Sequence, residues 1–118
     1  MNGRPLSGRG SGGGFFILMK IYISGKITGI EKEALKLFAD IEQKLKAQGH
    51  VVINPFYLPH LHDKKYASYM KEDIKALCDC DGILIMTNHS DSKGSMIEIL
   101  IAKFLGLEIM YEESCIFK

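Results

Sequence analysis

Residues Asp81–Leu107 read DGILIMTNHSDSKGSMIEILIAKFLGL and carry the strongest fold signal in the chain. The apolar run Ile83–Met86, bounded by Gly82 and a polar loop, is typical of a buried strand. After the loop, an apolar helix is expected to begin near Ser95 and to end at Gly106. This stretch therefore predicts a buried strand followed by a helix.

One acid, Glu98, lies in the apolar part of this expected helix, where an ionised carboxylate is costly unless something pairs with it or uses it. Two interpretations are open. Ser95-Met-Ile-Glu98 fits the S-x-x-E capping box, in which the glutamate folds back onto the helix start. Alternatively, Glu98 is a nucleophile or general base that points into a pocket at the carboxyl end of a parallel sheet.

The rest of the chain repeats the strand–helix pattern. Expected strands are Lys20–Ser24, Val51–Asn54, Gly82–Met86 and Leu107–Tyr111, and expected helices are Glu31–Gln48, Tyr66–Asp79 and Ser95–Leu105. Nearly all-apolar strands indicate a parallel sheet with helices on both faces. Right-handed crossovers then predict a doubly wound, Rossmann- or flavodoxin-like α/β fold of four to five strands in the order 2-1-3-4. The loops Ser24–Ile30 and Thr87–Gly94 should meet over one crevice.

Length and composition limit the possible functions. We expect residues 1–18, which begin with a Gly-, Arg- and Ser-rich run, to form a disordered leader or an appended extension, and residues 19–118 to form one domain. The net charge of +1 gives no basic footprint for nucleic acid, and no apolar run is long enough to span a bilayer. The three cysteines, Cys78, Cys80 and Cys115, have no framework spacing, which suits a reducing compartment and favours the cytoplasm.

The second expected helix also places an acid in an apolar stripe. The stripe consists of Tyr66, Tyr69, Met70, Asp73, Ile74 and Leu77. Asp73 lies in mid-helix, where it can cap nothing. Either the stripe is displaced by one residue and Asp73 sits at its edge, or Asp73 is a second buried carboxylate near the crevice. Two carboxylates with separate roles are what glycosyl-transfer chemistry needs.

The loop before this helix contains His60-x-His62 with Asp63, which are metal-binding residue types. A flexible loop with two or three candidate ligands and no fourth is a weak metal signal. We therefore expect no metal ion, and no other cofactor.

Five short motifs occur in a fixed order between Lys20 and about Tyr111. They are IYISGKITG at Ile21–Gly29, Asn54-Pro55, YMKEDI at Tyr69–Ile74, CDGI at Cys80–Ile83, and SKGSMIE at Ser92–Glu98. Together they resemble the nucleoside 2-deoxyribosyltransferase-like family, especially its short members, and they also resemble the deoxynucleoside 5′-monophosphate N-glycosidases.

This resemblance implies roles for individual residues. It implies that Glu98 attacks the anomeric carbon of a nucleoside or nucleotide, that Asp73 serves the base as proton donor or hydrogen-bond partner, and that Tyr22 orients the nucleophile. The implied substrate-binding residues are Ser24, Gly25, Ile27, Asn54, Ser92, Gly94 and Ser95. A serine rather than an aspartate at position 92 favours phosphorylated substrates in this family.

Two functions remain open. The first is an enzyme that cleaves or transfers at the N-glycosidic bond of a (deoxy)nucleoside or its 5′-monophosphate, and the combination of Glu98, Asp73 and Tyr22 favours it. The second is a nucleotide-binding module without turnover, which the short segment Glu112–Lys118 favours. A receiver domain would need an acid pair after strand one, where Ser24-Gly25 stands.

The third expected helix is apolar nearly all round. Its apolar residues are Met96, Ile97, Ile99, Leu100, Ile101 and Phe104. One sheet can cover only one face of a helix, so the other face should meet another surface. We therefore expect a homodimer or a larger symmetric oligomer.

Overall fold

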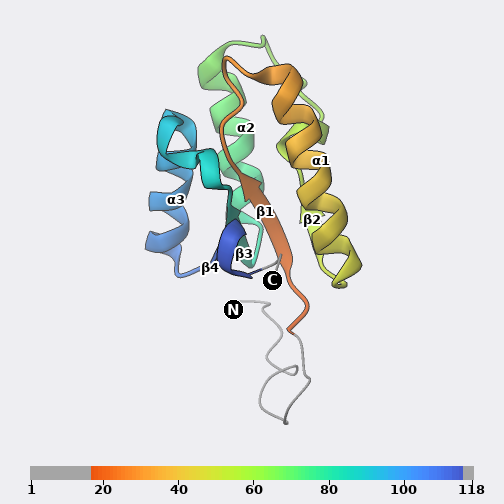
Figure 1. The fold of residues 1–118 in the computed structure, drawn as a ribbon. Coiled ribbons are helices and arrows are strands. Elements are labelled where there is room, and N and C mark those ends of the chain that lie inside the picture. Colours follow the sequence, from red (N-terminus) through yellow and green to blue (C-terminus); the bar gives the residue numbers. More distant parts are fainter. Residues whose placement is uncertain (1–16, 116–118) are drawn as a thin grey trace.

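Strands and helices alternate along the chain in the computed structural model, which describes residues 17–115 (Figure 1). The elements are β1 (Lys20–Ser24), α1 (Glu31–Ala47), β2 (Val51–Ile53), the 3₁₀ turn η1 (Pro55–Tyr57), α2 (Tyr66–Cys78), β3 (Gly82–Ile85), the 3₁₀ turn η2 (Thr87–Asp91), α3 (Lys93–Leu105), β4 (Glu108–Tyr111) and the short α4 (Glu112–Cys115). The leader predicted for residues 1–18 lies outside the described residues, except for Ile17 and Leu18.

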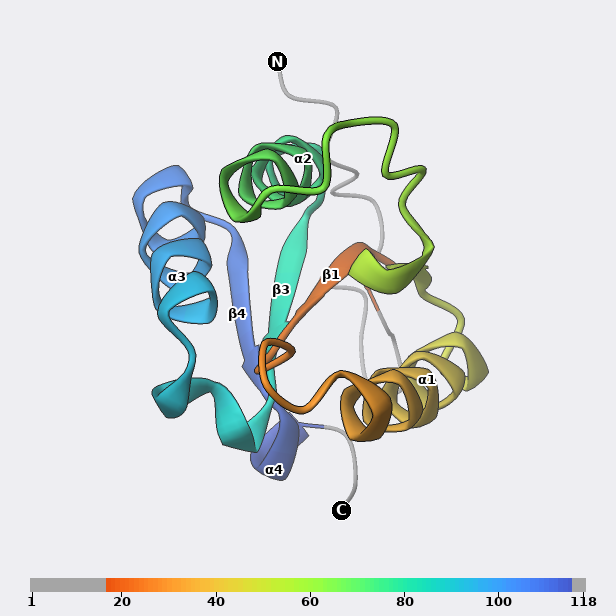
Figure 2. The same ribbon diagram turned by 90° about the horizontal axis from the view of Figure 1, so that it is seen from above.

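The four strands form a parallel sheet in the order β2-β1-β3-β4, which confirms the doubly wound topology expected from the sequence. The central strand β1 places Tyr22 in register with Ile53 of β2 and Ile83 of β3. Seen from the carboxyl ends of the strands, α1 covers one face of the sheet, and α2 and α3 cover the other (Figure 2). The connections leave β1 and β3 in opposite directions, so a crevice is expected between the loops that follow them.

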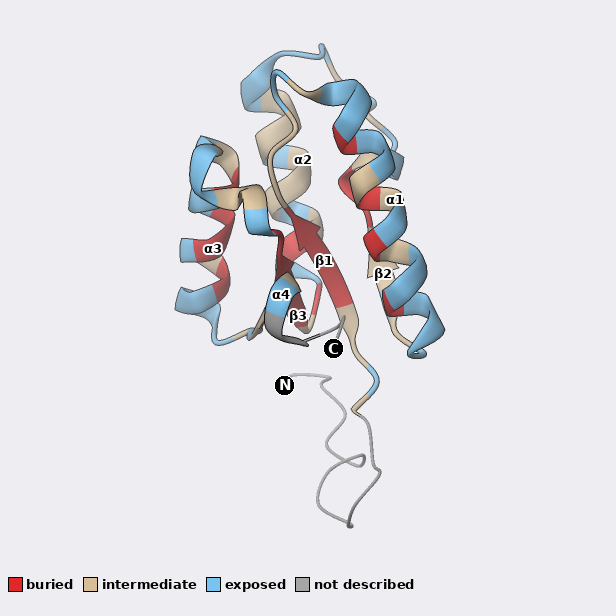
Figure 3. Ribbon diagram, viewed as in Figure 1, coloured by how far each residue is buried: buried red, intermediate tan, exposed pale blue. Residues whose placement is uncertain are grey.

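Strand β1 contributes to two separate cores, because successive residues of a strand point to opposite faces of the sheet. Ile21 and Ile23 pack beneath α1, against buried residues that include Phe38, Ile41 and Leu45. Tyr22 packs on the other face with residues of α2, β3 and α3, including Leu77, Ile83, Ile85, Ile99 and Ala102. The buried stripes of α1 and α3 face the sheet, and their outer sides are exposed (Figure 3).

Glycines follow the ends of the first and third helices, as the sequence predicts. Gly49 has φ +97° and Gly106 has φ +74°, a left-handed conformation that glycine adopts at low cost. The start of α3 differs from the expectation. The helix begins at Lys93 and not at Ser95, because Ser92 is the N-cap and its side chain accepts a hydrogen bond from the Ser95 N–H.

The loops after β1 and β3 meet at the carboxyl end of the sheet, as the switch-point rule predicts. The Lys26 N–H donates to Asn88 Oδ1 at 3.0 Å, and Lys26 Nζ forms an ion pair with Asp91 Oδ2 at 2.6 Å. These contacts close the crevice at one side. Among the described residues, none of the helices combines the length and the apolar character that crossing a membrane would require.

Candidate active site

A cavity of about 890 Å³ opens over the carboxyl ends of the strands. It is lined by residues of β1, of the loop after β1, of α1, of the segment around η1, of α2, and of the η2–α3 junction. Residues expected from the sequence to form a site and found in its lining are Tyr22, Gly25, Ile27, Asp73, Ser92, Gly94, Ser95 and Glu98. The fold therefore brings residues from widely separated motifs to one concave surface, where ligand sites usually lie.

Glu98 is almost completely buried, and each of its carboxylate oxygens accepts one hydroxyl hydrogen bond. Tyr22 Oη donates to Oε2 at 2.8 Å, and Ser24 Oγ donates to Oε1 at 2.7 Å. Both donors come from β1, two residues apart, so strand periodicity points them to the same face. Both oxygens of the carboxylate are thus held by hydroxyl groups of the central strand.

The capping-box interpretation of Glu98 is wrong for this structure. Ser92 takes the N-cap position, Ser95 is in the first turn of α3, and Glu98 lies one turn further on. The Glu98 carboxylate binds side-chain hydroxyls of β1 and not the amides of the helix start. Burial of this carboxylate is therefore unrelated to capping.

Burial raises the pKa of Glu98 to about 7, although the hydrogen bonds from Ser24 and Tyr22 act to lower it. A desolvated carboxylate loses the stabilisation that water gives to its charge, and two hydroxyl donors replace only part of it. Burial and the neighbouring carboxylates of Glu98 and Asp73 raise the pKa of Tyr22 well above its usual range. Tyr22 therefore stays protonated and remains a donor at any physiological pH.

Asp73 lines the same cavity from α2. Burial, and then the charges of Glu98 and Glu72, raise the pKa of the Asp73 carboxyl to about 8. A carboxyl that holds its proton at neutral pH can donate it to a leaving group. Of the two interpretations of Asp73, the structure agrees with a position near the crevice, but the carboxylate is only half-buried and not the buried one expected.

The walls of the cavity are largely apolar and aromatic, and no role at the site was expected of these side chains. They include Phe38 of α1, Phe56 of η1, and Tyr66, Tyr69 and Met70 of α2. Phe38 and Phe56 meet edge to face at a centroid distance of 5.3 Å. In the sequence, these side chains cannot be distinguished from ordinary core residues. Their place in the cavity wall is known only from the fold.

Two of the expected site residues do not line the cavity. Ser24 is completely buried and touches the lining residues Glu98 and Ser95. Asn54 is also buried, where its Oδ1 caps η1 through the Phe56 N–H and its Nδ2 donates to Glu42 Oε1 at 3.0 Å. The substrate-binding role expected of Asn54 has no support in this arrangement.

Gly25 is required by packing at the end of β1. A Cβ atom at this position would collide with the side chain of Met86, which follows β3. This close approach of two chain segments accounts for the glycine without reference to a ligand.

Three neighbouring side chains are of metal-binding types: His60, which lines the cavity, and His62 and Glu72 beside it. Glu72 Oε1 lies 2.6 Å from His60 Nδ1 and 3.2 Å from His62 Nε2. The Lys64 N–H donates to His62 Nδ1 at 3.0 Å, so the neutral ring carries its proton on Nε2, facing Glu72. A metal ion would need a lone pair on that same nitrogen. The arrangement therefore suits a hydrogen-bonded anchor for the loop better than a metal centre.

Asp63, which the sequence places beside these histidines, has a different role in the structure. Its Oδ1 accepts hydrogen bonds from Ser68 Oγ at 2.6 Å and from the Lys65 N–H at 3.0 Å. These contacts hold the start of α2. The partner of the two histidines is Glu72, which lies one helical turn beyond Ser68. Acidic residues are common on helix surfaces, so the sequence did not indicate this contact.

The fold is similar to that of a solved enzyme structure. A solved structure of a 2-deoxyribosyltransferase from the psychrotolerant bacterium Bacillus psychrosaccharolyticus is similar with a TM-score of 0.63 and 24% sequence identity, over 78% of this chain and 70% of that chain. This likeness confirms, at the level of the fold, the resemblance inferred from the motifs. No curated protein matches the chain.

A family model also matches the sequence over residues 19–111, which covers every element from β1 to β4 and so includes the whole candidate site. The chain therefore belongs to the family described as Domain of unknown function (DUF4406).

Proposed function

We propose that this protein breaks the N-glycosidic bond of a (deoxy)nucleoside or its 5′-monophosphate, with Glu98 as the nucleophile. The observation that carries the proposal is the Glu98 carboxylate, which is buried at the cavity surface and oriented by Tyr22 and Ser24. Burying a carboxylate without a cationic partner is unfavourable for stability. Such a position is explained when the carboxylate reacts with a bound molecule.

In the proposed reaction, a Glu98 oxygen forms a bond to the anomeric carbon as the bond from that carbon to the base nitrogen breaks. The electron pair of the broken bond goes to the base, which takes a proton from the Asp73 carboxyl. The resulting glycosyl ester is then opened by water, which gives hydrolysis, or by a second base, which gives transfer. An oxocarbenium-like transition state gains stability from the nearby carboxylate charge in either step.

The ionisation of the two carboxyls suits these roles. The reaction needs Glu98 charged and Asp73 protonated, and their pKa values of about 7 and about 8 allow both conditions between these limits. A site with one ionised and one protonated carboxyl at the working pH is typical of acid–base chemistry. The rate should therefore rise as pH passes through about 7 and fall as pH passes through about 8.

The walls and the rim suit a nucleotide. Phe56 and Tyr69 offer aromatic surface against which a nucleobase can stack. Lys93 lines the cavity at the start of α3, and a helix N-terminus with a nearby cation favours a phosphate group. Lys26 also lines the cavity, where it is paired with Asp91. These features support a 5′-monophosphate as the substrate.

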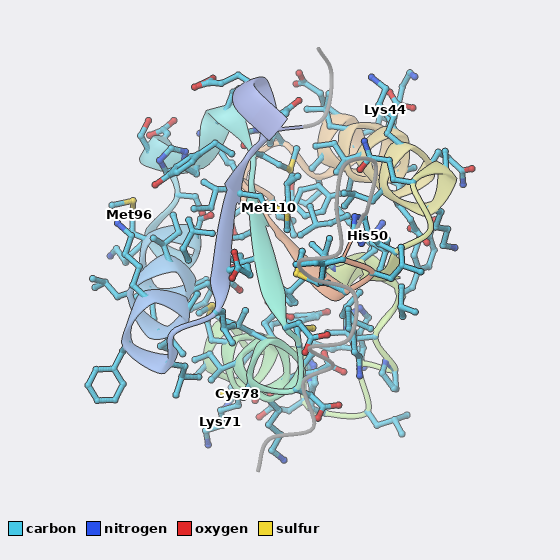
Figure 4. The ribbon with its side chains drawn as sticks, turned by 90° about the horizontal axis from the view of Figure 1, so that it is seen from below. Lys44, His50, Lys71, Cys78, Met96 and Met110 are labelled. Atoms are coloured by element: carbon cyan, nitrogen blue, oxygen red, sulfur yellow. The ribbon has the colours of Figure 1, made fainter. Side chains whose placement is uncertain are left out.

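The proposal includes a homodimer. On α3, the side chains of Leu100 and Phe104 are 67% and 88% exposed, and Met96 projects outward from the helix (Figure 4). These apolar residues lie on the side of α3 away from the sheet. A second copy of the same face would bury them in a symmetric contact.

The experiment is a panel of deoxynucleosides and deoxynucleoside 5′-monophosphates, each incubated with purified protein, with free base measured by chromatography. We expect base release with at least one monophosphate. Glu98→Gln should reduce the rate by about 10⁴-fold or more while the melting curve stays cooperative, because the amide cannot form the glycosyl ester. Ser90→Ala, an exposed change beside the site, is the matched control.

Two results would count against the proposal. Wild-type rates in a folded Glu98→Gln protein would remove the nucleophile. A wild-type protein inactive on every compound, but stabilised against heat by nucleotides, would instead indicate a binding module.

A further inference from the structure

Two buried hydroxyl groups lie in series behind the proposed nucleophile. Ser24 Oγ is 2.7 Å from Glu98 Oε1, and Ser95 Oγ is 2.5 Å from Ser24 Oγ. Ser24 is 0% exposed and Ser95 is 1% exposed. Ser95 lines the cavity, so the series Ser95–Ser24–Glu98 begins at the cavity and ends at the carboxylate.

Counting protons fixes the direction of each hydrogen bond. A serine hydroxyl has one proton to donate and two lone pairs that accept. An ionised Glu98 can only accept, so Ser24 must give its single proton to Oε1. The bond between the two serines is then possible in one direction only, with Ser95 donating to Ser24.

The local structure leaves the Ser95 hydroxyl available for this bond. The cap of α3 is supplied by Ser92, whose Oγ accepts from the Ser95 N–H at 3.1 Å, so the Ser95 side chain has no capping task. Ser95 and Glu98 are three residues apart on α3 and share one face of that helix. Ser24 is the last residue of β1 and lies opposite both.

We propose that Ser95 and Ser24 are positioning residues, which form an ordered hydroxyl chain that keeps Glu98 ionised and correctly oriented for attack. The inference rests on the proposed function for its catalytic meaning. Hydrogen bonds in a chain strengthen one another, because each donor is polarised by the bond that it accepts. Ser95 thus acts on Glu98 only through Ser24.

The chain works against burial, which favours the neutral acid. The titratable groups that face Glu98 are Tyr22 of β1 and Asp73 of α2. Tyr22 donates to the other carboxylate oxygen and is independent of the serines. Asp73 titrates close to Glu98 and would mix with its titration, so it should be replaced before Glu98 is measured.

The test is a direct titration of Glu98 in an Asp73→Asn background, using the ¹³C signal of labelled glutamate carboxyls. The Glu98 signal is identified by its absence in a Glu98→Gln protein. The same titration is run for Ser24→Ala, Ser95→Ala, the Ser24→Ala/Ser95→Ala double variant, and Ser90→Ala as the matched control. Circular dichroism checks that each variant is folded.

Ser24→Ala should raise the pKa of Glu98 by about one to two units, because a hydrogen bond to a charged group is lost. Ser95→Ala should raise it by a smaller amount, since Ser24 still donates. The double variant should match Ser24→Ala alone, and Ser90→Ala should match the parent. In the wild-type background, the acid limb of the rate profile should move to higher pH by the same steps.

The chain is overturned if Ser95→Ala leaves the pKa of Glu98 unchanged, or if its effect persists undiminished once Ser24 is alanine. If Ser24→Ala does not fold, Ser95→Ala alone decides, because its expected shift is upward from the parent value. The titration needs no turnover, so it separates the two proposals. A Glu98 pKa that responds to both serines in a protein whose Glu98→Gln variant keeps full activity would refute the function and leave the chain intact.

Discussion

Glu98 and Asp73 prefer their neutral forms more strongly in the folded protein than in an unfolded chain. Their pKa values are about 7 and about 8, against ordinary values of 4.5 and 3.8. Between these limits the folded protein binds more protons than the unfolded chain does, so the free energy of unfolding falls as pH rises. The stability that the neutral forms provide is complete below about pH 4 and is lost as pH passes through 7 and 8.

This linkage predicts a pH-dependent gain in stability for the double variant Asp73→Asn/Glu98→Gln. At pH 3, where these carboxyls are neutral in both the folded and the unfolded chain, the variant should have nearly the wild-type stability. At pH 9 it should be more stable than the wild type by a few kcal/mol, because it has no buried charge. Urea unfolding at pH 3, 7 and 9 measures this, and parallel pH curves for the two proteins would contradict it.

The proposed proton transfer from Asp73 predicts a loss that depends on the leaving base. Asp73→Asn should slow release by about 10²–10⁴-fold for bases that need protonation to leave. The loss should be much smaller for an activated base that leaves readily as an anion. Initial rates for a good and a poor leaving group measure the contrast, and an equal loss for both would remove the general-acid role.

Glu98 and Asp73 could be predicted because an acid at an apolar position of a helix stands out in the sequence pattern alone. The contact between Ser24 and Ser95 joins residues 71 positions apart. It depends on how α3 packs against β1, so no local sequence pattern reveals it. Glu72 escaped notice because acids are common on helix surfaces. Asn54 was expected at the site, but its amide is used by η1 and Glu42.

At the scale of elements, the ends of the four strands and of the helices α1 and α2 were predictable to within one residue, since their periodicities are clear. The start of α3 was the exception. Ser92 and Ser95 are both good N-cap types, and the S-x-x-E pattern favoured the second. In the structure Ser92 is the N-cap, because the Ser95 hydroxyl is hydrogen-bonded to Ser24 in a buried contact.

The observed cap predicts a difference between neighbouring serines. Ser92→Ala removes the acceptor of the Ser95 N–H and should lower the free energy of unfolding by about 1 kcal/mol. For a domain of this size, that corresponds to a fall in melting temperature of about 4–8 °C. Ser90→Ala, on the exposed surface of η2, should change it by much less. Equal effects of the two changes would show that the cap contributes nothing.

At the scale of the whole molecule, the proposed dimer rests on the exposed apolar residues of the outer face of α3. We expect the wild-type protein to sediment as a dimer or a larger oligomer at micromolar concentration. Phe104→Lys should shift it to monomer, because a lysine at the centre of an apolar contact is strongly unfavourable. Leu61→Lys is the control, since Leu61 is 91% exposed but lies on the loop before α2. A monomeric wild type would contradict the proposed dimer.

The proposed nucleophile and the aromatic walls of the cavity belong to different parts of the fold. Tyr22 and Glu98 stand on the central strand and on α3, whereas Phe56 and Tyr69 stand on η1 and α2. Laboratory evolution can therefore vary the two sets independently. If the proposed function holds, a library restricted to Phe56 and Tyr69 would resample the choice of base while every member keeps Glu98 and Tyr22 unaltered.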